Sequence, residues 1–294
     1  MLEIRELTRR FGENTAVDRV SFDVPAGLMT GFVGGNGAGK TTTMRMVMGV
    51  LGIDEGEVLW QGRPITRLDR RRIGYMPEER GLYPKQPILD QLVYIAQLKG
   101  MGRVEARAQV QELLERFGLG DRTKDNLEKL SLGNQQRVQI IASVLPKPAA
   151  LILDEPFSGL DPLAVDVVAG VLQSRAADGV AVLFSSHQLD VVERLCDDLV
   201  IIAGGTIRAA GARDTLRAQH STRRFELIAA GDAGWLRSEP GVTVQGFEGG
   251  YAVFDADSDE TAQRVLRRAL AQGDVASFAP QHPTLAQIFR EVIQ

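Results

Sequence analysis

The sequence has almost no cysteine and no long apolar run, and each of these two shortages excludes a class of protein. Its single cysteine, Cys196, cannot pair within the chain, which excludes a disulfide-stapled scaffold and suits a reducing cytoplasm. No stretch approaches the roughly 18 uninterrupted apolar residues of a membrane-spanning helix. Residues 1–10 carry acidic and basic side chains where a signal peptide has its apolar run. We therefore expect neither a membrane span nor secretion, and we expect Cys196 to be a small core residue.

The sequence also lacks an excess of positive charge. Its 34 Lys and Arg residues nearly balance 38 Asp and Glu residues, which leaves a net charge of -4. A general nucleic-acid-binding protein needs a positive field, so nucleic acid is not an expected partner. Only six of the basic residues are lysines, so a lysine within a motif is less often there by chance. With 294 residues and 44% hydrophobic composition, the chain can form one large domain and a smaller one.

The order of the apolar patterns predicts an α/β fold followed by a small α+β domain. Apolar strands are expected at about residues 20–24, 28–33, 150–154 and 180–186, and they alternate with helices as in a parallel sheet. Helical periodicity over about residues 86–146 predicts a helical insertion. Short strands and two amphipathic helices follow from about residue 220. We therefore predict domains at residues 1–219 and 220–294.

A glycine-rich motif lies between a predicted strand and a predicted helix, and it matches the pattern G-x-x-x-x-G-K-[ST]. Such glycines let backbone N–H groups surround an anion, and the following helix adds the positive end of its dipole. A lysine here reaches the β- and γ-phosphates of a nucleotide, and the hydroxyl after it ligates Mg²⁺. A flexible glycine turn without a ligand is the weaker alternative. The predicted phosphate-binding residues are Gly34, Gly35, Asn36, Gly37, Ala38, Gly39, Lys40, Thr41 and Thr42.

Two carboxylates, Asp154 and Glu155, follow the apolar strand Leu-Ile-Leu at its carboxyl end. Asp154 can hold Mg²⁺ beside the glycine-rich loop, together with Thr41. Glu155 points elsewhere and can polarise the attacking water as a general base. Paired acids before Pro156 could instead cap a helix, but the glycine-rich motif makes that reading weak. The motif alone leaves kinases, GTPases and many ATPases open.

A further motif, Leu130-Ser131-Leu132-Gly133-Asn134, lies just before a helical run. It resembles the signature sequence of ATP-binding cassette (ABC) proteins, usually LSGGQ. The resemblance implies a P-loop ABC cassette with a RecA-like core, an antiparallel β subdomain and a helical insertion, with ATP and Mg²⁺ as its ligands. Ser131 and the N–H of Gly133 would form an anion site at a helix N-terminus, too far along the chain to reach the same chain's glycine-rich loop. The resemblance therefore implies a head-to-tail dimer, in which Ser131, Gly133 and Asn134 contact ATP bound by the second subunit.

Other positions match this family. Asp161 in Ser-Gly-Leu-Asp resembles its D-loop, and His187, after a strand, resembles the switch histidine that contacts the γ-phosphate. With Lys40 and Glu155, His187 completes the implied catalytic set. Phe11 lies where the family places an aromatic ring on adenine; a core phenylalanine is the alternative. His220 and His282 match nothing, and we expect both at the surface.

Three departures from the family pattern involve four positions. Gly35 replaces a commoner proline, which should change no ligand. Leu132 and Asn134 replace a glycine and the last glutamine of the signature, which puts the affinity for the second subunit's nucleotide in doubt. Glu78 replaces the glutamine that senses Mg²⁺ and the membrane partner. Its carboxylate can ligate Mg²⁺, but it adds a negative charge that either Arg80 or the metal must offset.

The combination of Pro-Glu-Glu-Arg-Gly-Leu-Tyr-Pro, the signature and a small C-terminal domain resembles ATP-binding subunits of bacterial ABC-2 type exporters. That resemblance implies a peripheral position on the cytoplasmic face of the membrane, beside a separate permease of about six spanning helices. Two alternatives stay open. Soluble cassette proteins of ribosomes or DNA repair usually carry paired cassettes or coiled-coil insertions, which this sequence lacks. A module that binds ATP without hydrolysis would be favoured only if Lys40, Glu155 or His187 were missing.

Overall fold

The computed structural model describes residues 1–79, 81–220, 223–281 and 283–293. It divides into two compact units, Met1–Arg213 and Asp214–Val292. The extent of the domains, 1–219 and 220–294, stays a prediction. Arg80 and His282 lie outside the described residues. Among the residues that are described, no helix combines the length and the apolar character needed to cross a membrane.

The first unit contains two sheets. In the smaller sheet all pairings are antiparallel: β1 pairs with β2 and with β4, and β4 also pairs with β5. In the larger one, β6, β7, β8, β3 and β9 pair in parallel, and β10 joins antiparallel to β9. The strands are, in sheet order, β2 (Asn14–Val24), β1 (Leu2–Phe11), β4 (Glu55–Trp60) and β5 (Arg63–Pro64), then β10 (Thr206–Ala212), β9 (Asp198–Ala203), β3 (Met29–Val33), β8 (Ala181–Ser186), β7 (Ala150–Leu153) and β6 (Ile73–Met76).

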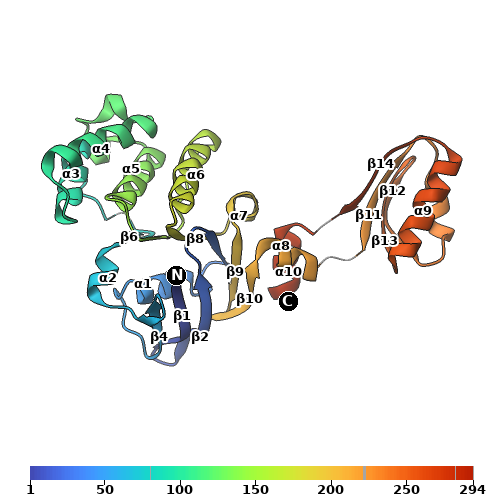
Figure 1. Cartoon of the computed structure of the whole chain (residues 1–294), viewed down its shortest axis with the longest axis horizontal. Helices are drawn as coiled ribbons and strands as arrows, with labels where there is room; N and C mark the ends of the chain where they lie inside the picture. The colour runs from blue at the N-terminus through green and yellow to red at the C-terminus, as the bar shows by residue number, and fades with distance from the viewer. Residues whose placement is uncertain (80, 221–222, 282, 294) are drawn as a thin grey trace. The chain divides into compact units, whose positions relative to one another are not determined.

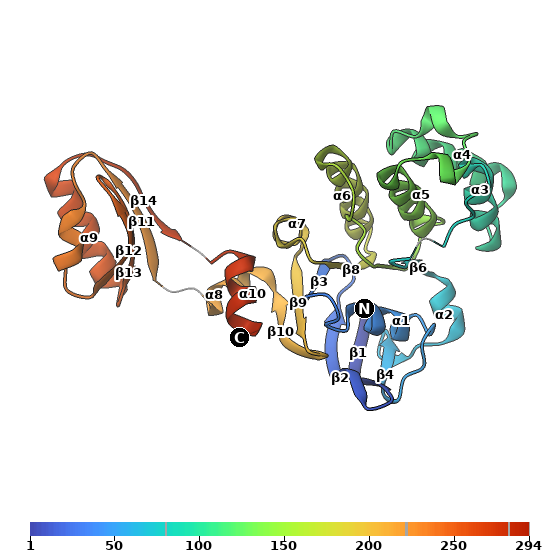
Figure 2. The ribbon, with the colours of Figure 1, turned by 180° about the vertical axis from the view of Figure 1, so that it is seen from behind.

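Seven α-helices are assigned in the described part of this unit: α1 (Lys40–Val47), α2 (Arg67–Arg71), α3 (Ile88–Leu98), α4 (Arg103–Arg116), α5 (Leu132–Val144), α6 (Pro162–Ala177) and α7 (Leu189–Leu195). Figures 1 and 2 show α3, α4 and α5 grouped at one end of the unit, and β1, β2 and β4 at the other. The predicted helical insertion and antiparallel subdomain are therefore confirmed. Phe22 from the small sheet and Phe32 from the large one pack 5.1 Å apart, in a core that both sheets share with α1.

The parallel sheet brings four chain segments to one edge. β3, β6, β7 and β8 run in the same direction, so the residues that follow them emerge together at the carboxyl ends of the strands. In open α/β sheets this edge is where ligands bind. The glycine-rich loop follows β3, Glu78 follows β6, Asp154 follows β7 and His187 follows β8.

The second unit is a four-stranded antiparallel sheet with helices, which confirms the predicted α+β class. Its strands are β12 (Val242–Glu248), β13 (Tyr251–Ala256), β11 (Arg224–Ala229) and β14 (Val275–Gln281), and its helices are α8 (Arg213–Gln219), α9 (Asp259–Gln272) and α10 (Leu285–Ile293). Helix α9 packs Val265 against Leu227 and Phe254 of the sheet. Its first turn is capped by the hydroxyl of Ser258, which accepts a hydrogen bond from the N–H of Thr261.

Cys196 and His220 are two single residues for which the sequence analysis made an expectation. Cys196 is buried in the first unit, where the core reading is confirmed. The side chain of His220 is partly exposed, at 24%, and its Nδ1 lies 3.2 Å from Oε2 of Glu291. This contact joins the end of α8 to α10, the two helices that lie side by side in Figures 1 and 2.

Candidate nucleotide-binding site

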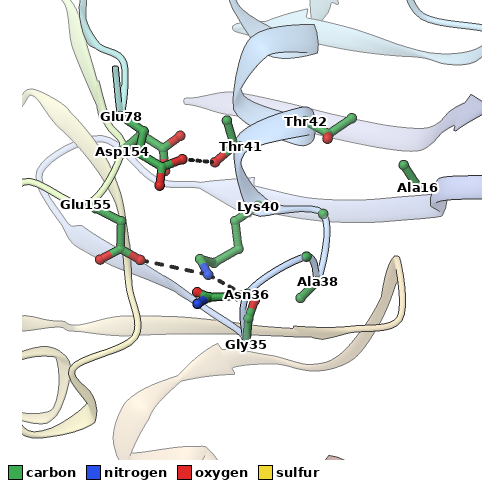
Figure 3. Close-up of a pocket in the computed structure, with 12 residues that line it drawn as sticks. Ala16, Gly35, Asn36, Ala38, Lys40, Thr41, Thr42, Glu78, Asp154 and Glu155 are labelled. Atoms are coloured by element: carbon green, nitrogen blue, oxygen red, sulfur yellow. Dashed lines mark hydrogen bonds and ion pairs between the residues drawn. The ribbon is translucent and has the colours of Figure 1, made fainter. Parts of the chain in front are cut away.

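The loop between β3 and α1 surrounds a pocket of about 200 Å³ (Figure 3). Two of its glycines have no room for a side chain. A Cβ at Gly34 would lie 2.5 Å from the carbonyl oxygen of Ile202, and one at Gly39 would lie 2.8 Å from that of Ala16. Gly39 also has a φ of 107°, which other residues rarely adopt. The lining residues are Ala16, Gly35, Asn36, Gly37, Ala38, Gly39, Lys40, Thr41, Thr42, Glu78, Asp154 and Glu155.

Lys40 begins α1 and its side chain folds back over the loop. Its ammonium donates hydrogen bonds to the carbonyl oxygens of Gly34, at 2.7 Å, and Gly35, at 3.2 Å. It also lies 3.8 Å from Oε1 of Glu155. The ammonium is thus held at the mouth of the loop, where it can form charge-assisted bonds to phosphate oxygens.

Three residues bring oxygen atoms to the start of α1: Thr41 of α1 itself, Glu78 after β6 and Asp154 after β7. Thr41 Oγ1 donates a hydrogen bond to Glu78 Oε2 at 3.3 Å. Asp154 is buried, and its Oδ1 accepts a hydrogen bond from the Ser185 hydroxyl at 2.5 Å. Its Oδ2 is buried with no hydrogen-bond partner among the described residues. Burying a carboxylate oxygen without a hydrogen-bond partner costs folding free energy, which a bound cation would offset. A hydroxyl with two carboxylates is a set of oxygen ligands that suits Mg²⁺. The residues therefore fit the implied metal.

Glu155 has an unusual backbone that turns its side chain into the site. Its φ of 52° lies in the left-handed region, which is sparsely populated for residues other than glycine. Two side chains hold this conformation: its N–H donates to Ser185 Oγ at 2.8 Å, and its carbonyl accepts from Gln136 Nε2 at 2.9 Å. Glu155 Oε2 then lies 2.9 Å from His187 Nδ1. Lys40, Glu155 and His187 are thereby brought together, as predicted.

Ser185, Gln136 and Gln139 were not predicted to belong to the site. Ser185 bonds to both acidic residues, Asp154 and Glu155. Gln139 Nε2 donates to the carbonyl oxygen of Pro77 at 2.8 Å and so supports the segment that carries Glu78. Both glutamines are buried on α5, three positions apart. Polar residues repeated on the buried face of a helix were the available signal.

The signature residues do not line this pocket. Ser131 is exposed at the start of α5, where its hydroxyl accepts a hydrogen bond from the N–H of Asn134 at 3.4 Å. A Cβ at Gly133 would lie 3.0 Å from the carbonyl oxygen of Gly159, so this glycine lets α5 approach the segment before α6. The structure thus places Ser131, Gly133 and Asn134 apart from the Lys40 pocket of the same chain.

Asp161 and Phe11 also do not line the pocket. Asp161 caps α6 by accepting from the N–H of Ala164 at 2.9 Å, and this bond, more than the nearby Arg137, lowers the pKa of its carboxyl group. Phe11 is 48% exposed, with the guanidinium carbon of Arg9 5.0 Å from its ring centre. The alternative that Phe11 is a core residue is therefore wrong.

Comparison with known proteins agrees with this geometry. A family model described as ABC transporter matches residues 17–158, and one described as the C-terminal domain of DrrA1-3-like ATP-binding proteins matches residues 211–293. The chain is 40% identical over 293 residues to YhaQ of Bacillus subtilis strain 168, named an uncharacterized ABC transporter ATP-binding protein, and the match covers 100% of this chain and 98% of that protein. It is 34% identical over 219 residues to the linearmycin resistance ATP-binding protein LnrL of the same organism, covering 74% of this chain and 70% of LnrL.

A solved structure shows the same fold. An ATP-binding subunit of an ABC transporter superposes with a TM-score of 0.69 at 32% identity, covering 74% of this chain and 92% of the other. The model match, the relatives and the pocket around Lys40 agree with one another. The chain belongs to the ATP-binding proteins of ABC transporters, a family of ATPases that hydrolyse ATP to power transport.

Proposed function

We propose that the chain powers export as one half of a dimer that encloses two ATP molecules. One observation carries this proposal: Ser131, at the start of α5, is exposed and does not line the Lys40 pocket of its own chain. A helix N-terminus with a serine and nearby backbone N–H groups favours an anion. A second copy, related head to tail, supplies the phosphate that this site contacts. Ser131, Gly133 and Asn134 then bind the ATP held by the partner's glycine-rich loop, and Asp161 lies between the subunits.

Each predicted site residue has its own role in ATP hydrolysis. The backbone of residues 34–39, Thr42 and the Lys40 ammonium bind and orient the phosphates, and Phe11 stacks on adenine. Glu155 accepts the proton of the attacking water, since its carboxylate lies beside Lys40 and is held by a fixed backbone. His187 contacts the γ-phosphate and, through Nδ1, orients Glu155.

Thr41, Asp154 and Glu78 would hold Mg²⁺. The buried, unpaired Oδ2 of Asp154 and the contact between Thr41 and Glu78 support this assignment. The chemistry that Mg²⁺ would supply when bound there is to offset the negative charge of the phosphates. Glu78 differs from the family's glutamine by adding a charge of its own to this set.

The partners are a second copy of the chain and a separate membrane permease of about six spanning helices. ABC-type ATP-binding subunits work with such membrane components. The likeness to LnrL, whose name assigns it to linearmycin resistance, supports export as the direction. The chain is peripheral, on the cytoplasmic face of the membrane, with the permease docked near residues 78–92. Domain 220–294 is an accessory domain of the same subunit.

Sedimentation of the Glu155→Gln variant tests the dimer. This variant keeps its phosphate-binding donors but loses the base, so Mg²⁺ and ATP should drive it from monomer to dimer. Adding Ser131→Arg should abolish the shift, because the new side chain fills the site of the partner's phosphate. Ser174→Arg, at an exposed serine of α6, is the matched control and should dimerise normally. A Glu155→Gln chain that stays monomeric at every concentration would contradict the proposal.

A further inference from the structure

The first unit contains a second pocket, of about 340 Å³, that shares no lining residue with the pocket around Lys40. It is formed by the end of α2, the end of α3 and the segment between α5 and β7. Residues 71–73 lead into β6, and residues 145–149 lead into β7. Because Glu78 and Asp154 follow the carboxyl ends of these strands, the second pocket lies at the opposite ends of the same strands. It cannot be part of the nucleotide site.

Among the described residues, every charged side chain that lines this pocket is positive. Four of its nine lining residues are Arg71, Arg72, Lys99 and Lys147, and the other five are apolar. Two of the chain's six lysines are therefore gathered here. Within the described part of the chain, the side chains of Arg71, Arg72 and Lys147 make no hydrogen bond or ion pair. The nearby carboxylate of Asp69 is already taken by Arg63, at 2.8 Å.

Lys99 is fixed at the wall of the pocket. Its Nζ donates to the carbonyl oxygens of Leu145, at 2.7 Å, and Ala142, at 3.3 Å, and so ties the end of α3 to the end of α5. Although Lys99 as a residue is exposed, burial of its ammonium lowers its pKa to about 8. Burial of an ammonium disfavours its charged form. A bound anion would favour the charged form and raise the pKa of Lys99.

We propose that this pocket binds the phosphate group of a small ligand. Arginine presents a planar fork of N–H donors that matches phosphate oxygens, and several cations around one cavity suit a group with more than one negative charge. The volume lies at the low end of the range for small-molecule sites, which fits a phosphate group and not a long polymer. Two sources share this chemistry: a soluble phosphate compound and the headgroup of an anionic phospholipid.

Lysine NMR on the full chain tests the site directly. The lysines are labelled by reductive ¹³C-methylation, which keeps their charge, and the nucleotide pocket is filled with saturating Mg²⁺ and ADP. Pyrophosphate is then titrated. We expect saturable shifts of the Lys99 and Lys147 signals, a raised pKa of Lys99 in the complex, and no shift at exposed Lys124. The Lys40 signal reports separately on the nucleotide pocket. Pyrophosphate binding in the nucleotide pocket is therefore distinguished from binding beside Lys99 and Lys147.

Charge-matched variants give the control. The triple variant Arg71→Gln, Arg72→Gln, Lys147→Gln loses three charge-assisted contacts. Its affinity for pyrophosphate should therefore fall by about tenfold or more. The variant Arg103→Gln, Arg107→Gln, Lys124→Gln removes the same residue types from exposed positions outside the pocket and should bind as the unmodified chain does. Thermal unfolding of both variants shows that each is folded.

A vesicle arm separates the two sources of phosphate. The chain is sedimented with phosphatidylcholine vesicles, with and without phosphatidic acid. Phosphatidic acid-dependent sedimentation that only the Arg71, Arg72 and Lys147 variant loses would identify a lipid headgroup, and pyrophosphate binding without it would identify a soluble ligand. The proposal is overturned if the Lys99 and Lys147 signals do not respond to either probe, or if the two triple variants bind equally.

Discussion

His187 Nδ1 lies 2.9 Å from Oε2 of Glu155, and Oε1 of the same carboxylate lies 3.8 Å from the ammonium of Lys40. One carboxylate is thus held between two residues that follow neighbouring strands of the sheet: Lys40 follows β3 and His187 follows β8. Neither contact alone fixes the side chain, but together they restrict both of its oxygens. This geometry favours a base that is positioned before the nucleotide arrives.

The first prediction concerns Glu155→Gln. The amide keeps the shape of the side chain but cannot accept a proton, so the turnover number for ATP should fall by about 10²-fold or more. ATP affinity, measured by equilibrium binding, should stay within about threefold, because the phosphate-binding donors remain. Asp166→Asn, at an exposed position on α6, is the control and should leave both values unchanged. Unchanged hydrolysis in Glu155→Gln would remove Glu155 from its role as the base.

The second prediction concerns Ser185→Ala. The Ser185 hydroxyl donates to Asp154 and accepts from the N–H of Glu155, and it is fully buried. Its loss leaves two buried groups unpaired, which should cost about 1–3 kcal/mol of unfolding free energy. Turnover should fall as well, because the strained backbone of Glu155 loses one of its two supports.

Ser186→Ala is the matched control for that change. Ser186 is the buried neighbour of Ser185, and its hydroxyl accepts a single bond from the N–H of Gln188 at 3.0 Å. We expect a smaller loss of stability and little change in turnover. Urea unfolding and steady-state kinetics of the two variants decide the point. Equal effects of the two substitutions would mean that Ser185 does not position the site.

The third prediction compares two neighbouring glycines. A Cβ at Gly34 would meet the carbonyl oxygen of Ile202 at 2.5 Å, while one at Gly35 would meet nothing within 4 Å. Gly34→Ala should therefore destabilise the fold by about 1–3 kcal/mol through overpacking. Gly35→Ala should stay within about 0.5 kcal/mol. The midpoints of denaturant unfolding measure both, and equal midpoints would show that the loop adjusts freely.

The glycine-rich loop and the succession of long strands and helices along the chain could be predicted because their signals are local. Eight consecutive residues specify the loop, and a period of two or 3.6 residues specifies each long element. The strand β14 was not predicted, because Pro280 interrupts its pattern and proline in a strand usually signals an edge, which β14 is. Helix α2 was missed because its five residues, Arg67–Arg71, are too short to show a period.

The supports of the site could not be predicted for a different reason. Ser185 reaches Asp154 across 31 residues of sequence, and Gln136 reaches the carbonyl of Glu155 across 19. Such contacts depend on the pairing of β7 with β8 and on the packing of α5, which no local pattern specifies. The resemblance predicted which residues would act on the nucleotide, but it did not predict the residues that hold them. The left-handed backbone of Glu155 likewise has no sequence signal.

The last prediction concerns Glu78→Gln, which restores the family's usual residue. Among the described residues, three carboxylates, from Glu78, Asp154 and Glu155, line the pocket with a single ammonium, that of Lys40. Removing one negative charge beside the triphosphate should raise the affinity for ATP in the presence of EDTA by about three- to tenfold. The affinity of the nucleotide-free chain for Mn²⁺, measured by electron paramagnetic resonance, should fall, because a neutral amide replaces a carboxylate next to Thr41.

Glu79→Gln is the matched control for this change, since it removes the same charge from the next residue. Glu79 does not line the pocket, and its exposed carboxylate pairs with Arg45 at 3.2 Å. It should therefore alter neither the ATP affinity in EDTA nor the affinity for Mn²⁺. If the two substitutions gave the same values, Glu78 would act only through the overall charge of the chain. If Glu78→Gln alone raised ATP affinity and weakened Mn²⁺ binding, the carboxylate would be a metal ligand that makes nucleotide binding more dependent on the cation.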